Sequence, residues 1–179
     1  MKIIRTILAA LCLLPALAFA QLTTPQMTTL KAVCAADTPC NDLMLAADDI
    51  GMAAWYNTAD PAYIVWRTSV SRAEVMRDAG FDWARVDNLT TGKSRIWEWL
   101  FLDGPMNPSA ANVRAGIDAA WVGTQADLNV RTAIYVLCKR AATRAEKALA
   151  SGSGTSGSPS VMTYQGSITY QQASTIRSL

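Results

Sequence analysis

Histidine, the side chain that proteins use most often for acid–base chemistry near neutral pH, is absent from this sequence of 179 residues. Histidine is also the commonest metal ligand. A Ser-His-Asp or Cys-His site therefore cannot form within the chain. The adjacent carboxylates Asp48 and Asp49 would not face each other on a helix, and Asp82 and Asp87 flank Arg85, which favours a local salt bridge. We therefore expect no catalytic residues, no metal site and no cofactor, and we predict that the protein is not an enzyme.

Cysteine offers a second kind of chemistry. Cys34 and Cys40 flank the turn-like stretch DTP at 37–39, and in an oxidising compartment they could close a small disulfide. The alternative is that both are unpaired, small apolar residues. Cys138 lies among apolar residues, so we expect it to be a buried core thiol. Three cysteines without histidine make a poor zinc site.

The stretch RIWEWLF (residues 95–101) holds the most conspicuous aromatic side chains. On a helix Trp97 fits the inward face, and Trp99 points about 160° away from it. Trp99 is then either an interface anchor, since tryptophan is enriched at binding hot spots, or part of a helix that is buried on two sides.

Basic residues recur at helical spacing near the end of the longest predicted helix. Arg140, Arg144 and Lys147 occupy positions i, i+4 and i+7. This stripe could contact phosphate or an acidic partner, or it could complement the helix dipole. With the aromatic residues, it completes the set of candidate interface residues: Trp97, Trp99, Phe101, Arg140, Arg144, Lys147, Tyr164 and Tyr170.

The elements that must position these residues are mainly helices. Apolar periodicity, caps and stops predict helices over residues 28–36, 41–56, 71–79, 91–102, 108–121 and 124–150. Residues 82–88 favour a helical turn, and residues 63–66 fit either a strand or the start of a buried helix. Ser71 with Glu74 forms a capping box. The pattern predicts a mainly α protein with one bundle-like domain over residues 21–150.

The composition changes after residue 150. Residues 151–160, SGSGTSGSPS, are typical of a flexible linker. Residues 161–179 contain two strand-like pieces around Gln165-Gly166, which predict a β-hairpin, and then a short helix that Thr169 and Gln172 could cap. This segment is too small to fold alone, so we interpret it as a docking tail.

The first 20 residues resemble a secretory signal. Lys2 and Arg5 precede an apolar run at 7–14, and the sequence Ala18-Phe19-Ala20 fits a cleavage site that would expose Gln21. The alternatives are a translated upstream region, with the protein starting at Met27, or an uncleaved anchor, although the apolar run is short.

Charge gives no sign of a nucleic-acid partner. The chain has 16 basic and 14 acidic residues, and removal of Lys2 and Arg5 would leave 14 of each. A neutral body provides no general attraction to nucleic acid or to an anionic membrane. We expect no nucleic-acid partner and no stable membrane span.

Four strings carry a family resemblance: WRTSVSRAEVM (66–76), FDWARVDNLTTGKSRIWEWLF (81–101), NPSAANVRAGIDAAWVGTQADL (107–128) and CKRAATRAEKALASGSG (138–154). From about residue 27 to the end, the chain resembles a family of small proteins of tailed bacteriophages and prophages, which lie in the virion structural and tail-assembly gene region. Such proteins typically begin near Met27, without a signal.

The resemblance implies a non-enzymatic phage protein that acts through protein–protein contacts, in tail assembly or as a minor virion component. Its partners would be other phage structural proteins or copies of itself, as a homo-oligomer, in the virion or the host cytoplasm. Residues 1–20 support the alternative, an exported periplasmic or secreted small helical binding protein.

Overall fold

The computed structural model describes residues 21–179, and the predicted signal in residues 1–20 lies outside them. The prediction of a mainly α protein is confirmed, since ten helices and two small sheets form within the described residues. In chain order the elements are α1 Thr24–Ala36, α2 Thr38–Leu45, α3 Asp49–Asn57, β1 Ala59–Trp66, α4 Arg72–Arg77, α5 Ala84–Asp87, α6 Thr91–Trp99, α7 Ala111–Ala120, α8 Gln125–Leu137, β2 Lys139–Thr143, α9 Arg144–Leu149, β3 Ala150–Ser151, β4 Val161–Met162 and α10 Tyr170–Ser178.

Capping boxes start several of these helices. The expected box of Ser71 and Glu74 opens α4, and Thr169 with Gln172 opens α10. In each box the hydroxyl accepts the N–H of the residue three positions on, whose side chain accepts the N–H of the cap. Further boxes open α1, α8 and α9.

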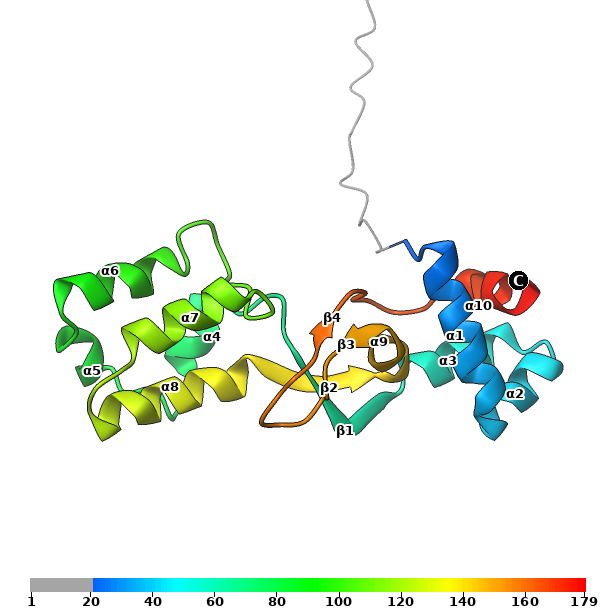
Figure 1. Cartoon of the computed structure of the whole chain (residues 1–179), viewed down its shortest axis with the longest axis horizontal. Coiled ribbons are helices and arrows are strands. Elements are labelled where there is room, and N and C mark those ends of the chain that lie inside the picture. Colours follow the sequence, from blue (N-terminus) through cyan, green and yellow to red (C-terminus); the bar gives the residue numbers. More distant parts are fainter. Residues whose placement is uncertain (1–20) are drawn as a thin grey trace, which may run out of the picture.

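The helices form two lobes, each with its own core (Figure 1). Lobe 1 consists of α1, α2, α3, α9 and α10 and is built around buried residues such as Leu30, Met52 and Tyr56. Lobe 2 consists of α4 to α8 and is built around Trp97, Trp121 and their neighbours. This arrangement corrects the predicted single bundle, because residues 21–150 divide between two separate cores.

An antiparallel ribbon of β1 and β2 joins the lobes (Figure 1). Its register pairs Ala59 with Thr143 at lobe 1 and Trp66 with Lys139 at lobe 2, with an irregularity between Asp60 and Ile64. The chain passes along β1 from lobe 1 to lobe 2 and returns along β2. Lobe 2 is therefore an insertion into lobe 1.

Several predicted helices have different bounds from those expected; α1 begins at Thr24 instead of residue 28, and α6 ends at Trp99 instead of residue 102. The helix expected over 124–150 ends at Leu137, because residues 139–143 pair with β1 and the capping box of Thr143 and Glu146 starts α9. The helix expected over 41–56 divides into α2 and α3, because Asp48 caps a new start at Gly51 N–H. The helix expected from residue 108 begins at Ala111.

The segment 151–160 is an ordered loop on the ribbon, which corrects the predicted flexible linker. Ile64 donates its N–H to the Gly154 carbonyl at 2.7 Å, and Trp66 donates to the Ser160 carbonyl at 2.9 Å. Ser160 in turn donates to the Ile64 carbonyl at 3.0 Å. Gly and Ser residues make this close approach possible because they add little side-chain bulk.

The C-terminal segment packs on lobe 1. The hairpin expected within residues 161–170 does not form, since β4 pairs with β3. Asn57 holds the Ile168 backbone through two side-chain hydrogen bonds. Arg177 forms an ion pair with Asp49 at 2.8 Å, which fixes α10 against α3.

Candidate functional site

The eight candidate interface residues do not form one surface. In lobe 2, Trp97 is only 2% exposed, and Phe101 packs edge-on against it with 5.0 Å between ring centroids. Trp99 is 61% exposed, so α6 is not buried on two sides, and Trp99 points outward. In the C-terminal segment, Tyr164 is buried and donates its hydroxyl to the Ser167 carbonyl, whereas Tyr170 is exposed.

The predicted basic stripe of Arg140, Arg144 and Lys147 does not form, because Arg140 belongs to β2 while Arg144 and Lys147 belong to α9. Arg140 forms two hydrogen bonds to the carboxylate of Glu146, at 2.6 and 2.7 Å. Arg144 lies over the ring of Trp55, with 4.7 Å from its Cζ to the ring centroid. The Lys147 ammonium pairs with Asp60 at 2.7 Å.

Cys34 and Cys40 form a disulfide that joins the end of α1 to the start of α2. Both residues are fully buried in the core of lobe 1. Cys138 is a buried free thiol, and burial raises its pKa to about 12. A thiol with so high a pKa is largely protonated at neutral pH and is therefore a poor nucleophile.

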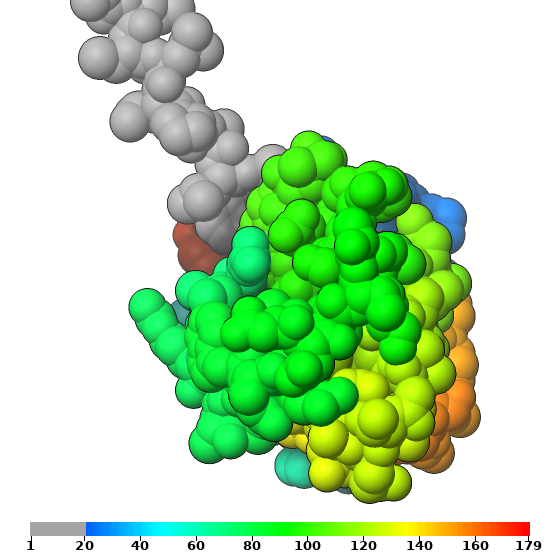
Figure 2. Space-filling view, turned by 90° about the vertical axis from the view of Figure 1, so that its left-hand side faces the viewer, coloured from blue at the N-terminus to red at the C-terminus, as the bar shows by residue number. Residues whose placement is uncertain are grey.

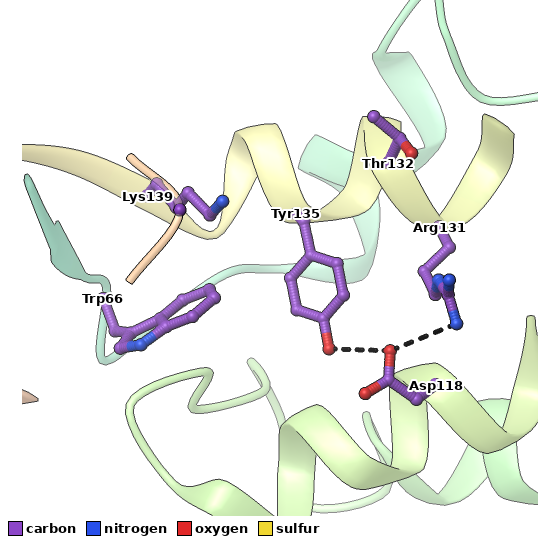
Figure 3. A pocket seen from close by; sticks show the side chains of 7 residues that line it. Trp66, Asp118, Arg131, Thr132, Tyr135 and Lys139 are labelled. Carbon is purple, nitrogen blue, oxygen red and sulfur yellow. Dashed lines mark hydrogen bonds and ion pairs between the residues drawn. The ribbon is translucent and has the colours of Figure 1, made fainter. Parts of the chain in front are cut away.

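A hollow of about 580 Å³ lies where lobe 2 meets the ribbon, and we call it the α8 hollow. Its walls come from β1, α7, α8, β2 and the loop at 151–160 (Figure 3). It is lined by Trp66, Asp118, Arg131, Thr132, Tyr135, Lys139 and Gly157. It is a shallow hollow that is open to solvent and does not enclose a cavity.

Polar contacts hold one wall of the α8 hollow. Tyr135 and Arg131 both point from α8 toward Asp118 on α7 (Figure 3). The Tyr135 hydroxyl donates to Asp118 Oδ1 at 3.0 Å, and the Arg131 guanidinium is 3.5 Å from the same oxygen. Burial, together with the hydrogen bond to Asp118, raises the pKa of Tyr135 above its usual value. Tyr135 is therefore a hydrogen-bond donor here and not a source of phenolate.

Cations cover the aromatic wall. The Lys139 ammonium lies 5.4 Å from the Trp66 ring centroid and 5.9 Å from that of Tyr135, and it donates to the Ser156 carbonyl. Arg114 lies over the same Trp66 ring at 4.9 Å. Such cation–π contacts hold the charged groups near the rings. Lys139 has no ion-pair partner within residues 21–179, so its charge is available to an anionic group.

The α8 hollow combines residue types that dominate protein interfaces. Tryptophan, tyrosine and arginine are enriched among the residues that contribute most binding energy, and Trp66, Tyr135 and Arg131 line this hollow. Across the part of the chain that the structure describes, no group of three or more acidic or cysteine side chains could hold a metal ion. The arrangement places two cations, Arg131 and Lys139, beside the aromatic rings of Trp66 and Tyr135.

Sequence reasoning missed this hollow. Arg131, Tyr135 and Lys139 are spaced at four-residue steps, which was a usable signal for one shared face. Trp66 and Asp118 come from distant parts of the sequence, and only the β1–β2 pairing and the packing of α7 near α8 bring them there. Local patterns carry no information on such pairings.

Lobe 2 also carries exposed apolar side chains that do not line the α8 hollow. Figure 2 views the molecule from the side of lobe 2, where the segments from α5 to α8 face the viewer in green to yellow. Exposed residues of lobe 2 include Trp83 and Leu102 in addition to Trp99. Within residues 21–179, every helix is too short or too polar to cross a bilayer.

Comparison of the chain with protein-family models, with curated proteins and with solved structures gave no match.

Proposed function

We propose that this protein is a non-enzymatic component of phage virion or tail assembly, and that it works by binding another structural protein. The proposal combines the family resemblance of the sequence with one feature of the structure, the α8 hollow. Its arginine and aromatic lining is typical of an interface that binds protein. The two-lobed body with an insertion offers separate surfaces for separate partners.

The partner segment that suits the α8 hollow is acidic. Lys139 and Arg131 provide two cations against one carboxylate, Asp118. The whole described body is close to neutral in charge, so the preference is local and does not extend to nucleic acid. An acidic loop or strand of a tail protein would meet both cations and pack against Trp66.

The test is capture of a known virion protein from infected cells. The full chain is tagged at its C-terminus, expressed during infection and purified, and the bound phage structural proteins are quantified by mass spectrometry. We expect one tail or virion protein at a fixed stoichiometry. Arg131→Glu should reduce its recovery at least tenfold, because it removes a cation and adds a like charge next to an acidic segment.

Arg95→Glu is the matched control. Arg95 lies on α6 at a different site, next to Glu98, and the variant makes the same charge change without touching the α8 hollow. Its recovery of the partner should equal that of the wild type. A monomer that captures no virion protein, or equal losses in both variants, would rule out this function.

A second candidate is an exported binding protein, and the Cys34–Cys40 disulfide favours it. Disulfides persist mainly in oxidising compartments. Leu22 is 6% exposed in the core of lobe 1, and Thr23 caps α1, so the residues just after position 20 belong to the folded body. A start at Met27 would remove both of them.

This candidate is tested by the mass and the first residues of the protein made from its own gene. An N-terminus at Gln21 in periplasmic or secreted material supports export. A protein that begins at Met27 and remains in the cytoplasm contradicts it and leaves assembly in the cytoplasm as the function.

A further inference from the structure

A second hollow, of about 390 Å³, lies in lobe 1 beside α9, and we call it the α9 hollow. It is lined by Val33, Asp37, Trp55, Asp60, Arg144, Lys147 and Ala148. Three of these residues, Val33, Trp55 and Ala148, are apolar, and the remaining four carry charges. It is separate from the α8 hollow, since no residue lines both.

The charges of the α9 hollow are only partly paired. Lys147 and Asp60 form an ion pair at 2.7 Å. Arg144 and Asp37 have no ion-pair partner within residues 21–179. One cation and one anion are therefore left on the walls of an apolar hollow.

Both unpaired groups are held in place. The Arg144 guanidinium lies over the Trp55 ring, and the Arg144 backbone N–H donates to the Thr58 carbonyl at 3.0 Å. Asp37 lies inside the ring closed by the Cys34–Cys40 disulfide, and its Oδ1 accepts the N–H of Cys40 at 3.2 Å. Fixed charges lose little freedom on binding a ligand, which favours affinity.

Trp55 forms a rigid part of the wall of the α9 hollow. Trp55 is only 9% exposed, and its indole Nε1 is buried without an acceptor among the described residues. Buried N–H groups are almost always hydrogen-bonded, because an unmatched donor costs free energy. Nε1 has almost no accessible surface, so this donor belongs to the inner side of the Trp55 ring, and a ligand in the hollow would meet the rest of the ring and Arg144.

We propose that the α9 hollow binds a small zwitterion with an apolar side chain, a free amino acid or a short peptide. Its carboxylate pairs with Arg144, beside the Trp55 ring. Its ammonium group faces Asp37, and its side chain lies on Val33 and Ala148. The proposal is independent of the protein-assembly function, since it concerns another lobe and another class of ligand.

The test uses leucine and the dipeptide alanyl-leucine as probes, with the disulfide-intact full chain. Binding is followed by calorimetry and by the NMR resonance of the Trp55 indole N–H. We expect saturable binding of at least one probe and a shift of that resonance. The half-ligands 4-methylpentanoate and isoamylamine, each of which lacks one charge, should bind at least tenfold more weakly.

Two variants locate the binding. Arg144→Gln removes the cation, and Asp37→Asn removes the anion but keeps a side chain that caps a helix equally well. Each should weaken binding by about tenfold or more, as expected for loss of a charge-assisted hydrogen bond. Asp42→Asn on α2 and Arg131→Gln at the α8 hollow are the matched controls, and both should bind as the wild type does.

The proposal is overturned if neither probe saturates at millimolar concentration while the protein is folded. It is also overturned if 4-methylpentanoate binds as well as leucine, which would describe a simple anion site. Equal affinity in Arg144→Gln and the wild type would place the binding elsewhere. The backbone NMR spectrum of each variant establishes that it is folded.

Discussion

Trp97 and Trp99 lie two residues apart on α6, but Trp97 is buried and Trp99 is exposed. Trp97 is stacked on Phe81 and meets Trp121 edge-on, with ring centroids 5.9 and 5.3 Å away. Trp99 has most of its surface in solvent. The same residue type therefore serves the core in one case and is available for contacts in the other.

Truncation of these two residues should have very different effects on stability. We expect Trp97→Ala to lower the free energy of unfolding by about 3–5 kcal/mol, because it leaves a large cavity. Trp99→Ala should change it by less than about 0.5 kcal/mol, as is usual for exposed positions. Urea unfolding followed by circular dichroism measures both, and similar losses would contradict the burial described for α6.

Gly154 holds the loop at 151–160 close to the Tyr63 ring. It is buried, it has a φ of +66°, and a Cβ at this position would overlap the Tyr63 ring. Tyr63 also donates its hydroxyl to the Gly152 carbonyl and lies 2.8 Å from the Ser160 hydroxyl oxygen. The close approach of loop and ring requires glycine here.

We therefore expect Gly154→Ala to lower the free energy of unfolding by at least about 1–2 kcal/mol, the typical cost of the left-handed conformation alone. Gly157→Ala is the matched control, because nothing lies within 4 Å of its Cβ position and its φ is not in the left-handed region. Thermal unfolding compares the two. Equal melting temperatures would mean that the loop does not lie on Tyr63.

At the scale of single elements, the N-terminus of α8 shows how a cap can also join elements. Asp127 accepts the Thr124 N–H at 3.0 Å and pairs with Arg85 of α5 at 2.7 Å. The Arg85 guanidinium and the hydrogen bonds from Thr124 lower the pKa of Asp127 to about 2. One carboxylate thus starts α8 and fixes α5 beside it.

This arrangement makes the stability of lobe 2 depend on pH. The folded pKa of Asp127, about 2, lies below the unfolded value of about 4. The contribution is therefore complete above about pH 4 and is lost as the pH falls toward about 2. Between about pH 2 and 4, unfolding of the wild type takes up a proton at Asp127. The Asp127→Asn variant should take up about one proton fewer, so its unfolding free energy should depend less steeply on pH than that of the wild type.

The exposed Asp103 provides the comparison, since Asp103→Asn leaves α8 and Arg85 untouched. Its pH profile of unfolding should match that of the wild type. If Asp127→Asn gave the same profile as well, Asp127 would not be coupled to Arg85 in the folded protein.

Elements fixed by local signals could be predicted from the sequence, and elements fixed by distant pairing could not. The boxes at Ser71 and Thr169 have their partner three residues away, so the starts of α4 and α10 follow from the sequence. Residues 139–143 have helical spacing but leave the helix because β1, more than 70 positions earlier, offers backbone partners. Residues 151–160 have the composition of a linker, and the same distant strand orders them.

The candidate sites follow the same rule. The types of residue at the α8 and α9 hollows were visible, and Arg144 and Lys147 were among the expected interface residues. Their partners were not visible, since Trp55 and Asp60 reach α9 only through the packing of α3 and β1. Helical spacing alone predicted a shared face for Arg140, which instead bonds Glu146.

At the scale of the whole molecule, the two cores and the narrow ribbon favour independent unfolding of the lobes. Each lobe has its own buried cluster, and domains with separate cores often depart from two-state behaviour. Lobe 1 alone carries the Cys34–Cys40 disulfide. Of the six tryptophans, only Trp55 lies in the core of lobe 1.

We therefore expect two unfolding transitions, with tryptophan fluorescence reporting mainly lobe 2 and circular dichroism reporting both lobes. Reduction should destabilise only the lobe 1 transition, by about 2 kcal/mol for a disulfide that closes so short a ring. The unfolded, unreduced protein should retain the Cys34–Cys40 bridge in a thiol count. A single transition seen equally by both probes, shifted as a whole by the reductant, would show one cooperative unit.

The insertion of lobe 2 into lobe 1 also sets an order of events during synthesis. Helices α1 to α3 leave the ribosome first, but α9 and α10, which complete their core, follow only after all of lobe 2. At roughly 5–20 residues per second, this interval lasts roughly 5 to 20 seconds. During this interval, Leu30 and Tyr56 are not yet covered by α9 and α10. The Cys34–Cys40 disulfide can already form, because its cysteines are only six residues apart. Lobe 2, which is continuous in the chain, can be complete before the lobe that surrounds it in sequence.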